Sequence, residues 1–255
     1  MCHLQPVDWS SGWPVMGNTG EPYWKFRKPK SDSKTIVNPV ETDEFDSSKL
    51  GMQWQWQNDY KESYGQATSM GFFRLFTYAL PELGDVSNLW YVPNMLLQKI
   101  PADEFTATTK LSFCSRNSDQ YVGLVCMSAE YSSVGLQRTE DGYELQIRHN
   151  PNAMRTHLTD EVLTVDTLKP TQKGTPRKGR PAEMHIKDVY LRMSIKDSKV
   201  NYAYSIDGKK WKKAGGEYAM GKGRWIGSKI GFFAVDPNKT GRKGFIDIDW
   251  FRISR

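Results

Sequence analysis

Pairs of acidic residues are the first side chains in this sequence that could carry chemistry. They occur at Asp103-Glu104, at Asp160-Glu161, and as Asp247 and Asp249 two positions apart. Two carboxyl groups act as general acid and general base when their surroundings tune their pKa values and place them around a substrate. The first pair precedes a predicted strand, the second lies beside a turn, and the third shares a strand face. We therefore interpret them as ordinary strand-end carboxylates.

Tryptophans flanked by amide side chains are the second candidates, because an indole ring stacks on the apolar face of a sugar while amides bond its hydroxyls. The candidate carbohydrate-binding residues are Trp54, Trp56, Trp90 and Asn94, with glutamines at positions 53, 55 and 57 nearby. Trp54 and Trp56 also share a predicted strand face with Met52. Such an apolar row is typical of a core, so core packing is the favoured interpretation for these two rings.

The other residue types that carry chemistry show no motif. His149, His157 and His185 are well separated without metal-ligand spacing, and no serine lies in a Gly-X-Ser-X-Gly turn. The three cysteines give neither a disulfide framework nor a CXXC pair. Cys114 and Cys126 lie in apolar strand patterns, so we expect two buried thiols, with a Cys114–Cys126 bridge as the alternative.

The net charge of +6 is concentrated in one segment, where basic residues alternate with proline and glycine. Its basic residues are Lys169, Lys173, Arg177, Lys178 and Arg180. Such a segment predicts a solvated loop, and it lacks the aromatic residues that stack on bases, so we expect no nucleic-acid partner. No stretch approaches the length of a membrane span and no signal peptide is recognisable, so we expect no membrane partner either.

Apolar and polar residues alternate along most of the chain, which predicts β-strands. The clearest rows are residues 105–113, 189–195 and 200–206, and turn signals lie at Asp141-Gly142, Asp197-Ser198 and Asp207-Gly208. Further strands are expected at residues 72–78, 121–131, 143–148, 225–235 and 244–253. No window shows a helical apolar stripe. The sequence therefore predicts an all-β sandwich of two antiparallel sheets.

The amino-terminal residues differ from the rest of the chain. Residues 1–29 are rich in turns and predict one strand and an extended arm, residues 30–40 a polar linker, and residues 41–255 the sandwich. A lone strand cannot satisfy its own backbone groups. We therefore expect the strand at residues 4–7 to belong to another sheet, which this chain does not encode.

Blocks of residues along nearly the whole chain resemble glycoside hydrolase family 43 enzymes that act on β-xylosides and α-L-arabinofuranosides. Residues 3–15, with Trp9 and Trp13, resemble the end of the five-bladed propeller of those enzymes. The sandwich resembles their C-terminal domain in the blocks at residues 43–56, 88–107, 225–231 and 247–252. The resemblance implies a concanavalin A-like jelly roll with the last propeller strand as its arm.

The resemblance implies different roles for the two domains of such an enzyme. The family hydrolyses glycosidic bonds by inversion, with three carboxylates that come from early propeller blades. No acidic residue here matches those motifs, so we assign no catalytic residue and expect no hydrolysis by this chain. The implied parent is a periplasmic or extracellular bacterial enzyme acting on xylan- or arabinoxylan-derived oligosaccharides. The implied partners are that oligosaccharide and the missing propeller, whose substrate pocket this domain helps to shape.

Concanavalin A-like sandwiches of carbohydrate enzymes also hold a structural calcium ion between their first and last strands. Glu44 and Asp249 are the candidate ligands, although calcium needs six to eight oxygen atoms. Two alternative functions stay open: a free-standing carbohydrate-binding module, and a nucleic-acid binder that uses the basic segment.

Overall fold

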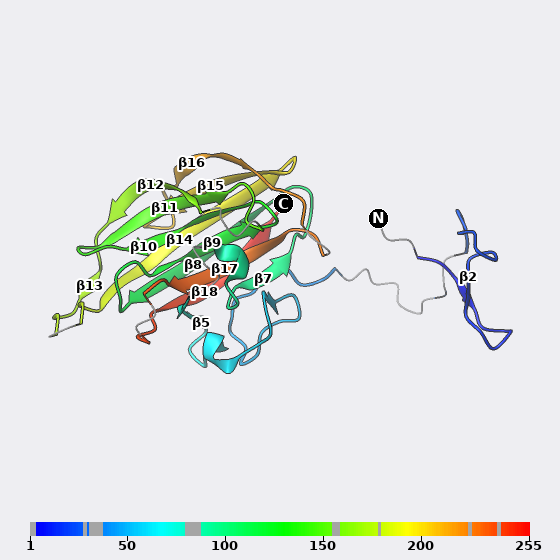
Figure 1. Cartoon of the computed structure of the whole chain (residues 1–255), viewed down its shortest axis with the longest axis horizontal. Helices are drawn as coiled ribbons and strands as arrows, with labels where there is room; N and C mark the ends of the chain where they lie inside the picture. The colour runs from blue at the N-terminus through cyan, green and yellow to red at the C-terminus, as the bar shows by residue number, and fades with distance from the viewer. Residues whose placement is uncertain are drawn as a thin grey trace. The chain divides into compact units, whose positions relative to one another are not determined.

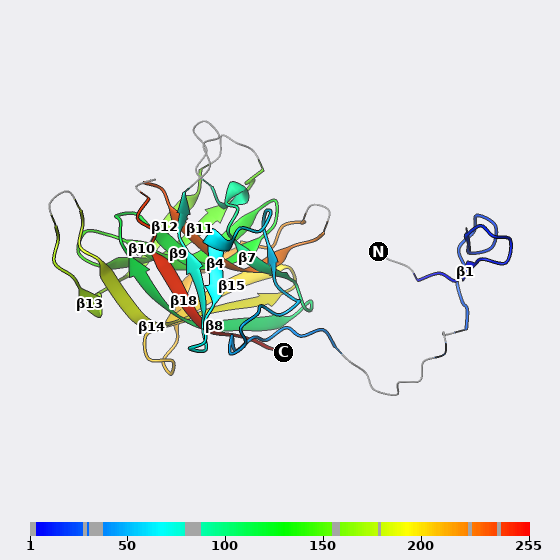
Figure 2. The same ribbon diagram turned by 90° about the horizontal axis from the view of Figure 1, so that it is seen from below.

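The computed structural model describes residues 4–27, 30, 38–79, 88–154, 159–177, 180–223, 226–238 and 241–255. The chain forms two compact units, Met1–Asn38 and Pro39–Arg255. The larger unit consists of strands (Figures 1 and 2), and the helical elements of the described residues are the short 3₁₀ turns η1 (Glu62–Tyr64) and η2 (Leu89–Tyr91). No helix among them is long and apolar enough to cross a membrane. The all-β prediction is confirmed.

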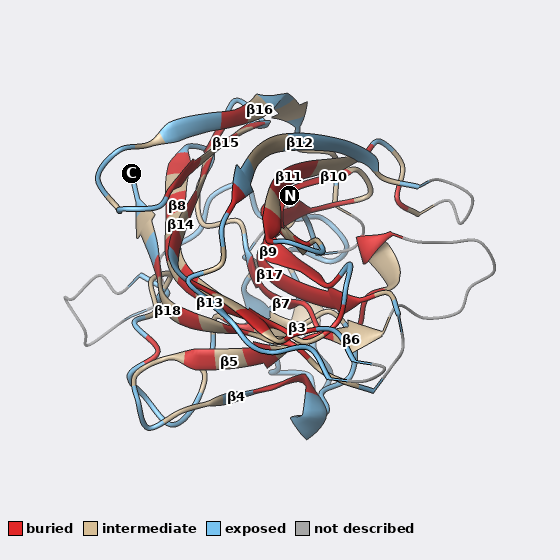
Figure 3. Ribbon diagram, turned by 90° about the vertical axis from the view of Figure 1, so that its left-hand side faces the viewer, coloured by how far each residue is buried: buried red, intermediate tan, exposed pale blue. Residues whose placement is uncertain are grey.

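Two sheets of eight strands pack face to face in the larger unit (Figure 3). The first sheet has the order β12 (Glu161–Leu168), β11 (Tyr143–Asn150), β10 (Tyr131–Arg138), β9 (Tyr121–Met127), β17 (Lys229–Asp236), β7 (Leu96–Lys99) and β3 (Gln55–Trp56), with β6 (Tyr78–Ala79) parallel to β17. The second has the order β16 (Lys212–Ala219), β15 (Lys199–Ser205), β14 (Met184–Lys196), β8 (Phe105–Ser115), β18 (Phe245–Ser254), β5 (Phe73–Phe76) and β4 (Gly65–Ala67), with β13 (Gln172–Lys173) beside β14.

The core lies between the sheets and is formed by the alternating rows of the sequence. In β8, Phe105, Leu111 and Phe113 are buried, whereas the residues between them lie on the half-exposed outer face. Each such buried side chain stabilises the fold by about 1.5–3 kcal/mol. The first sheet is covered on its second face as well, so all seven residues of β9 are buried. The cover includes Leu89 of η2 and Ala153 of the segment after β11.

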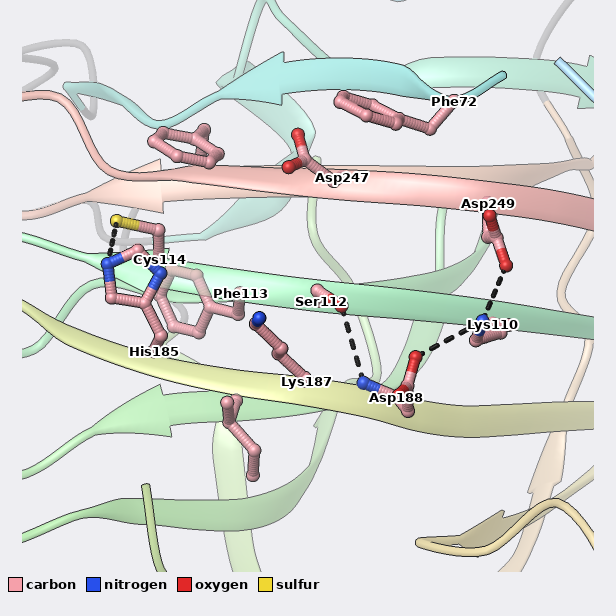
Figure 4. A pocket seen from close by; sticks show the side chains of 12 residues that line it. Phe72, Lys110, Ser112, Phe113, Cys114, His185, Lys187, Asp188, Asp247 and Asp249 are labelled. Atoms are coloured by element: carbon pink, nitrogen blue, oxygen red, sulfur yellow. Dashed lines mark hydrogen bonds and ion pairs between the residues drawn. The ribbon is translucent and has the colours of Figure 1, made fainter. Parts of the chain in front are cut away.

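Two β-bulges interrupt the second sheet at one level, one on each side of β8. In β14 the register shifts between Ile186 and Val189, and in β18 it shifts between Ile248 and Trp250. A bulge leaves extra residues outside the ladder. The extra residues here include Asp188 and Asp249, and both carboxylates bind Lys110 of β8 (Figure 4).

Several strand predictions differ from the structure. The strand predicted at residues 121–131 ends as β9 at Met127, and the chain turns before β10 begins at Tyr131. Strand β12 was not predicted, since this edge strand is largely exposed and lacks an apolar row. The row at residues 52–56 contains only the short strand β3, and Met52 is fully exposed instead of sharing a core face. Met52 is exposed because the chain turns there, and the Trp54 amide donates to the Gly51 carbonyl.

The smaller unit contains a two-stranded hairpin of β1 (Val7–Asp8) and β2 (Val15–Met16). The Gln5 side chain extends it by accepting from the Tyr23 amide at 2.8 Å and donating to the Tyr23 carbonyl at 3.2 Å. The lone strand predicted at residues 4–7 is thus corrected to a short strand that pairs within its own unit. A hairpin of this size buries few side chains, so Trp24 is 92% exposed. Residues 31–37 of the predicted linker lie outside the described residues.

Candidate functional site

A cavity beside Trp90 combines an aromatic ring with polar side chains. Its volume is about 320 Å³, and it is lined by Gln57, Trp90, Met127, Ser128, Gly223, Ile226, Gly227 and Lys229. The turn η2 positions the ring, because the Asn88 side chain caps the turn by accepting from the Trp90 amide at 3.0 Å. Trp90 is half-buried and packs against the second apolar cluster. One part of its indole therefore belongs to the protein and another to the cavity.

The polar groups of this cavity are ordered by one another. The Lys229 ammonium donates to Gln57 Oε1 at 2.6 Å, and Gln57 Nε2 donates to the Trp90 carbonyl at 3.3 Å. Burial lowers the pKa of Lys229, because the charged ammonium loses water there. A half-buried ring with fixed donors and acceptors at its rim is an arrangement that suits a sugar.

Trp54 lies deeper in the protein than Trp56 and Trp90, which are both half-buried. Trp56 is half-buried, with its ring 5.6 Å from that of Tyr64 and 6.2 Å from that of Phe73. Trp54 is 8% exposed and lies against Phe45 and Phe251 in the core. Its ring is enclosed by these side chains, which agrees with the core packing favoured for Trp54, and sugar binding at this residue stays a prediction.

Asn94 is also a structural residue. It is fully buried, and its amide nitrogen donates to the carbonyls of Phe76 at 2.7 Å and Ala234 at 3.0 Å. Those carbonyls lie on two different segments, so the side chain links β5 to β17. Asn94 thus bonds the backbone of the protein itself, and its role as a sugar ligand stays a prediction.

Glu44 and Asp249 each bind a cation of the protein. Glu44 forms a two-pronged ion pair with Arg252, whose Nε and a terminal nitrogen are both 2.8 Å from its oxygens. That pairing lowers the pKa of Glu44. Asp249 lies 2.7 Å from the Lys110 ammonium (Figure 4). Neither belongs to a set of three potential metal ligands among the described residues. A calcium site needs six to eight oxygen atoms, so backbone carbonyls or water would have to complete the shell, and calcium at Glu44 and Asp249 stays a prediction.

The other acidic pairs make structural interactions too. Glu104 binds Lys196 at 2.9 Å, Glu161 binds His149 at 3.1 Å, and Asp247 binds Arg74 through two bonds at 2.7 and 2.8 Å. Asp160 accepts from Asn150 at 3.0 Å and from the Tyr131 hydroxyl. These contacts indicate that the acidic side chains stabilise the sandwich.

Sequence spacing did not reveal a cluster of Cys114, Glu183 and His185. Cys114 and His185 are 71 residues apart and become neighbours only because β8 pairs with β14. A usable signal was the spacing of Glu183 and His185, since residues two apart in a strand share a face. Cys114 and Cys126 are both free buried thiols, as the buried-thiol prediction had it. His157, Lys178 and Trp225 lie outside the described residues.

The two packed eight-stranded sheets define an all-β sandwich. A family model described as the beta xylosidase C-terminal concanavalin A-like domain matches residues 42–254. The chain belongs to this family, which is the C-terminal domain of glycoside hydrolase family 43 β-xylosidases. The resemblance found in the sequence is confirmed.

Individual relatives agree with the family match. The chain is 28% identical to a β-xylosidase of Formosa agariphila over 97% of its own length and 41% of that protein. It is 28% identical to a putative β-xylosidase of Xylanibacter ruminicola, over 90% of this chain and 38% of that one. The solved xylan β-1,4-xylosidase of Bacillus halodurans has the same fold, with a TM-score of 0.68, 19% identity, and coverage of 98% of this chain and 46% of that one. The chain thus spans less than half the length of these relatives.

Proposed function

We propose that this chain is the accessory C-terminal domain of a family 43 glycoside hydrolase that acts on xylan- or arabinoxylan-derived oligosaccharides. The domain shapes the substrate pocket, and the bond-breaking carboxylates come from a catalytic propeller outside this chain. The family match and the share of each relative that is covered support this assignment. The ion pairs and hydrogen bonds that hold the candidate acids in this chain support it as well.

The cavity at Trp90 is the single observation that supports a location for the substrate-facing surface of the domain. It joins the residue after β3, the turn η2, the end of β9 and the start of β17, so four separate segments converge on it. Its rim carries the exposed side chain of Ile226 beside Lys229 and Gln57. We assign this end of the sandwich to the wall that faces the substrate. A wall of this kind contributes contacts to a sugar held mainly by another domain.

The chain by itself should therefore show neither hydrolysis nor tight sugar binding. We expect no release of nitrophenol from nitrophenyl β-xyloside, and only millimolar or weaker affinity for xylo-oligosaccharides by calorimetry. A Kd of about 10 μM or tighter, corresponding to roughly −7 kcal/mol, would instead support a free-standing carbohydrate-binding module. Turnover that survives purification would contradict the proposal itself.

The positive test joins this chain to a propeller. If the DNA upstream of the first codon encodes one in frame, the whole polypeptide should hydrolyse nitrophenyl xyloside. Trp90→Ala should then lower kcat/KM about two- to tenfold, because a ring contact contributes about 0.5–1.5 kcal/mol. Trp211→Ala is the matched control, since that half-exposed ring stacks on Arg192 in the second sheet, outside the residues lining the cavity. Equal activity of both variants would remove the Trp90 cavity from the substrate pocket.

A further inference from the structure

Three different metal-binding donors meet on the outer face of the second sheet. Cys114 of β8 pairs directly across the ladder with His185 of β14, and Glu183 lies two residues before His185 on the same face. Among the residues that the structure describes, this is the only set of three His, Cys, Asp or Glu side chains whose donor atoms all lie within 4.8 Å of one another.

The contacts converge on one nitrogen of the imidazole. His185 Nε2 lies 3.4 Å from Cys114 Sγ (Figure 4) and 2.9 Å from Glu183 Oε1. A catalytic relay uses the two ring nitrogens separately, one for the nucleophile and one for the acid. His149 has that divided arrangement, with Glu161 on Nδ1 and Glu130 on Nε2, each at 3.1 Å. At His185 the thiol, the carboxylate and the ring nitrogen instead surround a common point.

The distances between the donors are close to those around a tetrahedral zinc ion. Zinc bonds of about 2.3 Å to sulfur and about 2.1 Å to nitrogen or oxygen separate sulfur from nitrogen by about 3.6 Å, and nitrogen from oxygen by about 3.4 Å. The observed separations are 3.4 and 2.9 Å. Movements of roughly half an ångström, within the reach of a side-chain rotation, therefore admit the ion.

The surroundings provide both support and access. Arg116 Nε binds Glu183 Oε2 at 2.7 Å, which fixes the carboxylate and leaves Oε1 directed at His185. Such outer contacts orient metal ligands in known sites. Cys114 and His185 also line an open cavity of about 210 Å³ (Figure 4). An ion can enter from that side, where a fourth ligand also has room.

We propose that Cys114, Glu183 and His185 form a binding site for a transition-metal ion, with Zn²⁺ as the preferred metal and the cavity at the fourth position. The thiolate disfavours Ca²⁺ and Mg²⁺, and a mixed sulfur, nitrogen and oxygen set suits Zn²⁺. Binding releases the thiol proton to solvent as the Zn–S bond forms. The ion ties β8 to the start of β14. Its binding site is proposed independently of the glycosidase assignment.

The test uses Co²⁺ as a spectroscopic probe on the complete, reduced, chelator-treated chain. The adjacent residues Cys2 and His3 could bind cobalt themselves. The test therefore uses a Cys2→Ser background, which removes the Cys2 thiol. We expect one equivalent of Co²⁺ to produce the charge-transfer band of a cobalt thiolate together with the visible bands of four-coordinate cobalt. Added Zn²⁺ should abolish both, because zinc binds more tightly than cobalt to such sites.

Variants locate the site. Cys114→Ser should abolish the thiolate band, and Glu183→Gln should weaken Co²⁺ binding at least about tenfold. Cys126→Ser and His149→Gln are the matched controls and should leave the spectrum unchanged. If Cys114→Ser does not fold, as judged by circular dichroism, Glu183→Gln at the half-exposed surface still decides the result. No band in the background chain, a band that survives in Cys114→Ser, or full affinity in Glu183→Gln would overturn the proposal.

Discussion

Trp54 and Trp90 show how one residue type takes two roles in this domain. Trp54 donates its indole N–H to Asp43 at 2.7 Å and is enclosed by core rings, whereas Trp90 lies at a cavity. The sequence identified both as candidates, because each has amides nearby. It favoured core packing for Trp54 from a row shared with Met52, but Met52 is exposed, and the rings that enclose Trp54 include Phe232 and Phe251, which are distant in sequence. The spacing of residues in the sequence does not indicate which side chains are buried by distant segments.

Asp160 should make stability depend on pH with an unusual sign. Burial raises its pKa, and its Oδ2 has no hydrogen-bond partner among the described residues. A carboxyl with a raised folded pKa supports the fold while protonated, and that support is lost as pH rises through the folded pKa. Asp160→Asn should therefore gain stability relative to the natural chain as pH increases from 4 to 7. Urea unfolding across this range measures the difference.

Asp207 is the matched control with the opposite sign. The amides of Lys210 and Lys209 lower its pKa to about 2. A lowered folded pKa gives stability that is present at neutral pH and is lost as pH falls toward that value. Asp207→Asn should therefore be less stable than the natural chain at pH 7, with the difference shrinking in acid. The same trend with pH in both variants would contradict the role given to Asp160.

At the scale of strands, regular alternation was predicted and interruptions were not. The row at residues 105–113 corresponds closely to β8 (Phe105–Ser115), and the turn signals at Asp141-Gly142 and Asp197-Ser198 lie where strands end. The bulge of β14 was not predicted, although the apolar row changes phase there, from Met184 and Ile186 to Val189 and Leu191. The metal cluster was missed, since it depends on which strands become neighbours.

The turn between β14 and β15 should be improvable by one substitution. Asp197 and Ser198 have φ values of 51° and 57°, the left-handed region that side chains disfavour. Ser198→Gly should raise the free energy of unfolding by about 0.5–1 kcal/mol, because glycine adopts this conformation without strain. Guanidinium unfolding of the variant measures the gain.

A serine within the strand provides the comparison. Ser194→Gly in β14 should lower the free energy of unfolding by about 1 kcal/mol, since it loses a contact with Thr106 Oγ at 3.0 Å and adds backbone freedom. If both glycine variants were destabilised equally, the positive φ at Ser198 would not be a source of strain.

For the whole molecule, the sandwich has its own complete core. The residues of its apolar clusters belong to the unit Pro39–Arg255, while the hairpin unit exposes Trp9, Trp13 and Trp24. The division agrees with a domain that spans less than half the length of its relatives.

Removal of residues 1–38 should therefore leave the sandwich intact. We expect the Tm to change by less than about 2 °C, which corresponds to less than about 1 kcal/mol for a domain of this size. Tryptophan fluorescence should shift to shorter wavelength, because the rings at positions 9, 13 and 24 are exposed. A large drop in Tm on deletion, with the intact chain measured in parallel, would show that the hairpin unit contributes to the stability of the sandwich.

The two bulges beside Lys110 divide the second sheet into two halves. The Asp188 amide donates to the Ser112 hydroxyl at 3.3 Å instead of to a neighbouring carbonyl, so backbone pairing pauses at this level. β18 departs from regular pairing at the same level of β8. A bulge bends its strand and increases the local twist, so the sheet changes direction along this line. Cys114 and His185 pair on one side of the line, so an ion bound there would cross-link β8 and β14 on that side alone.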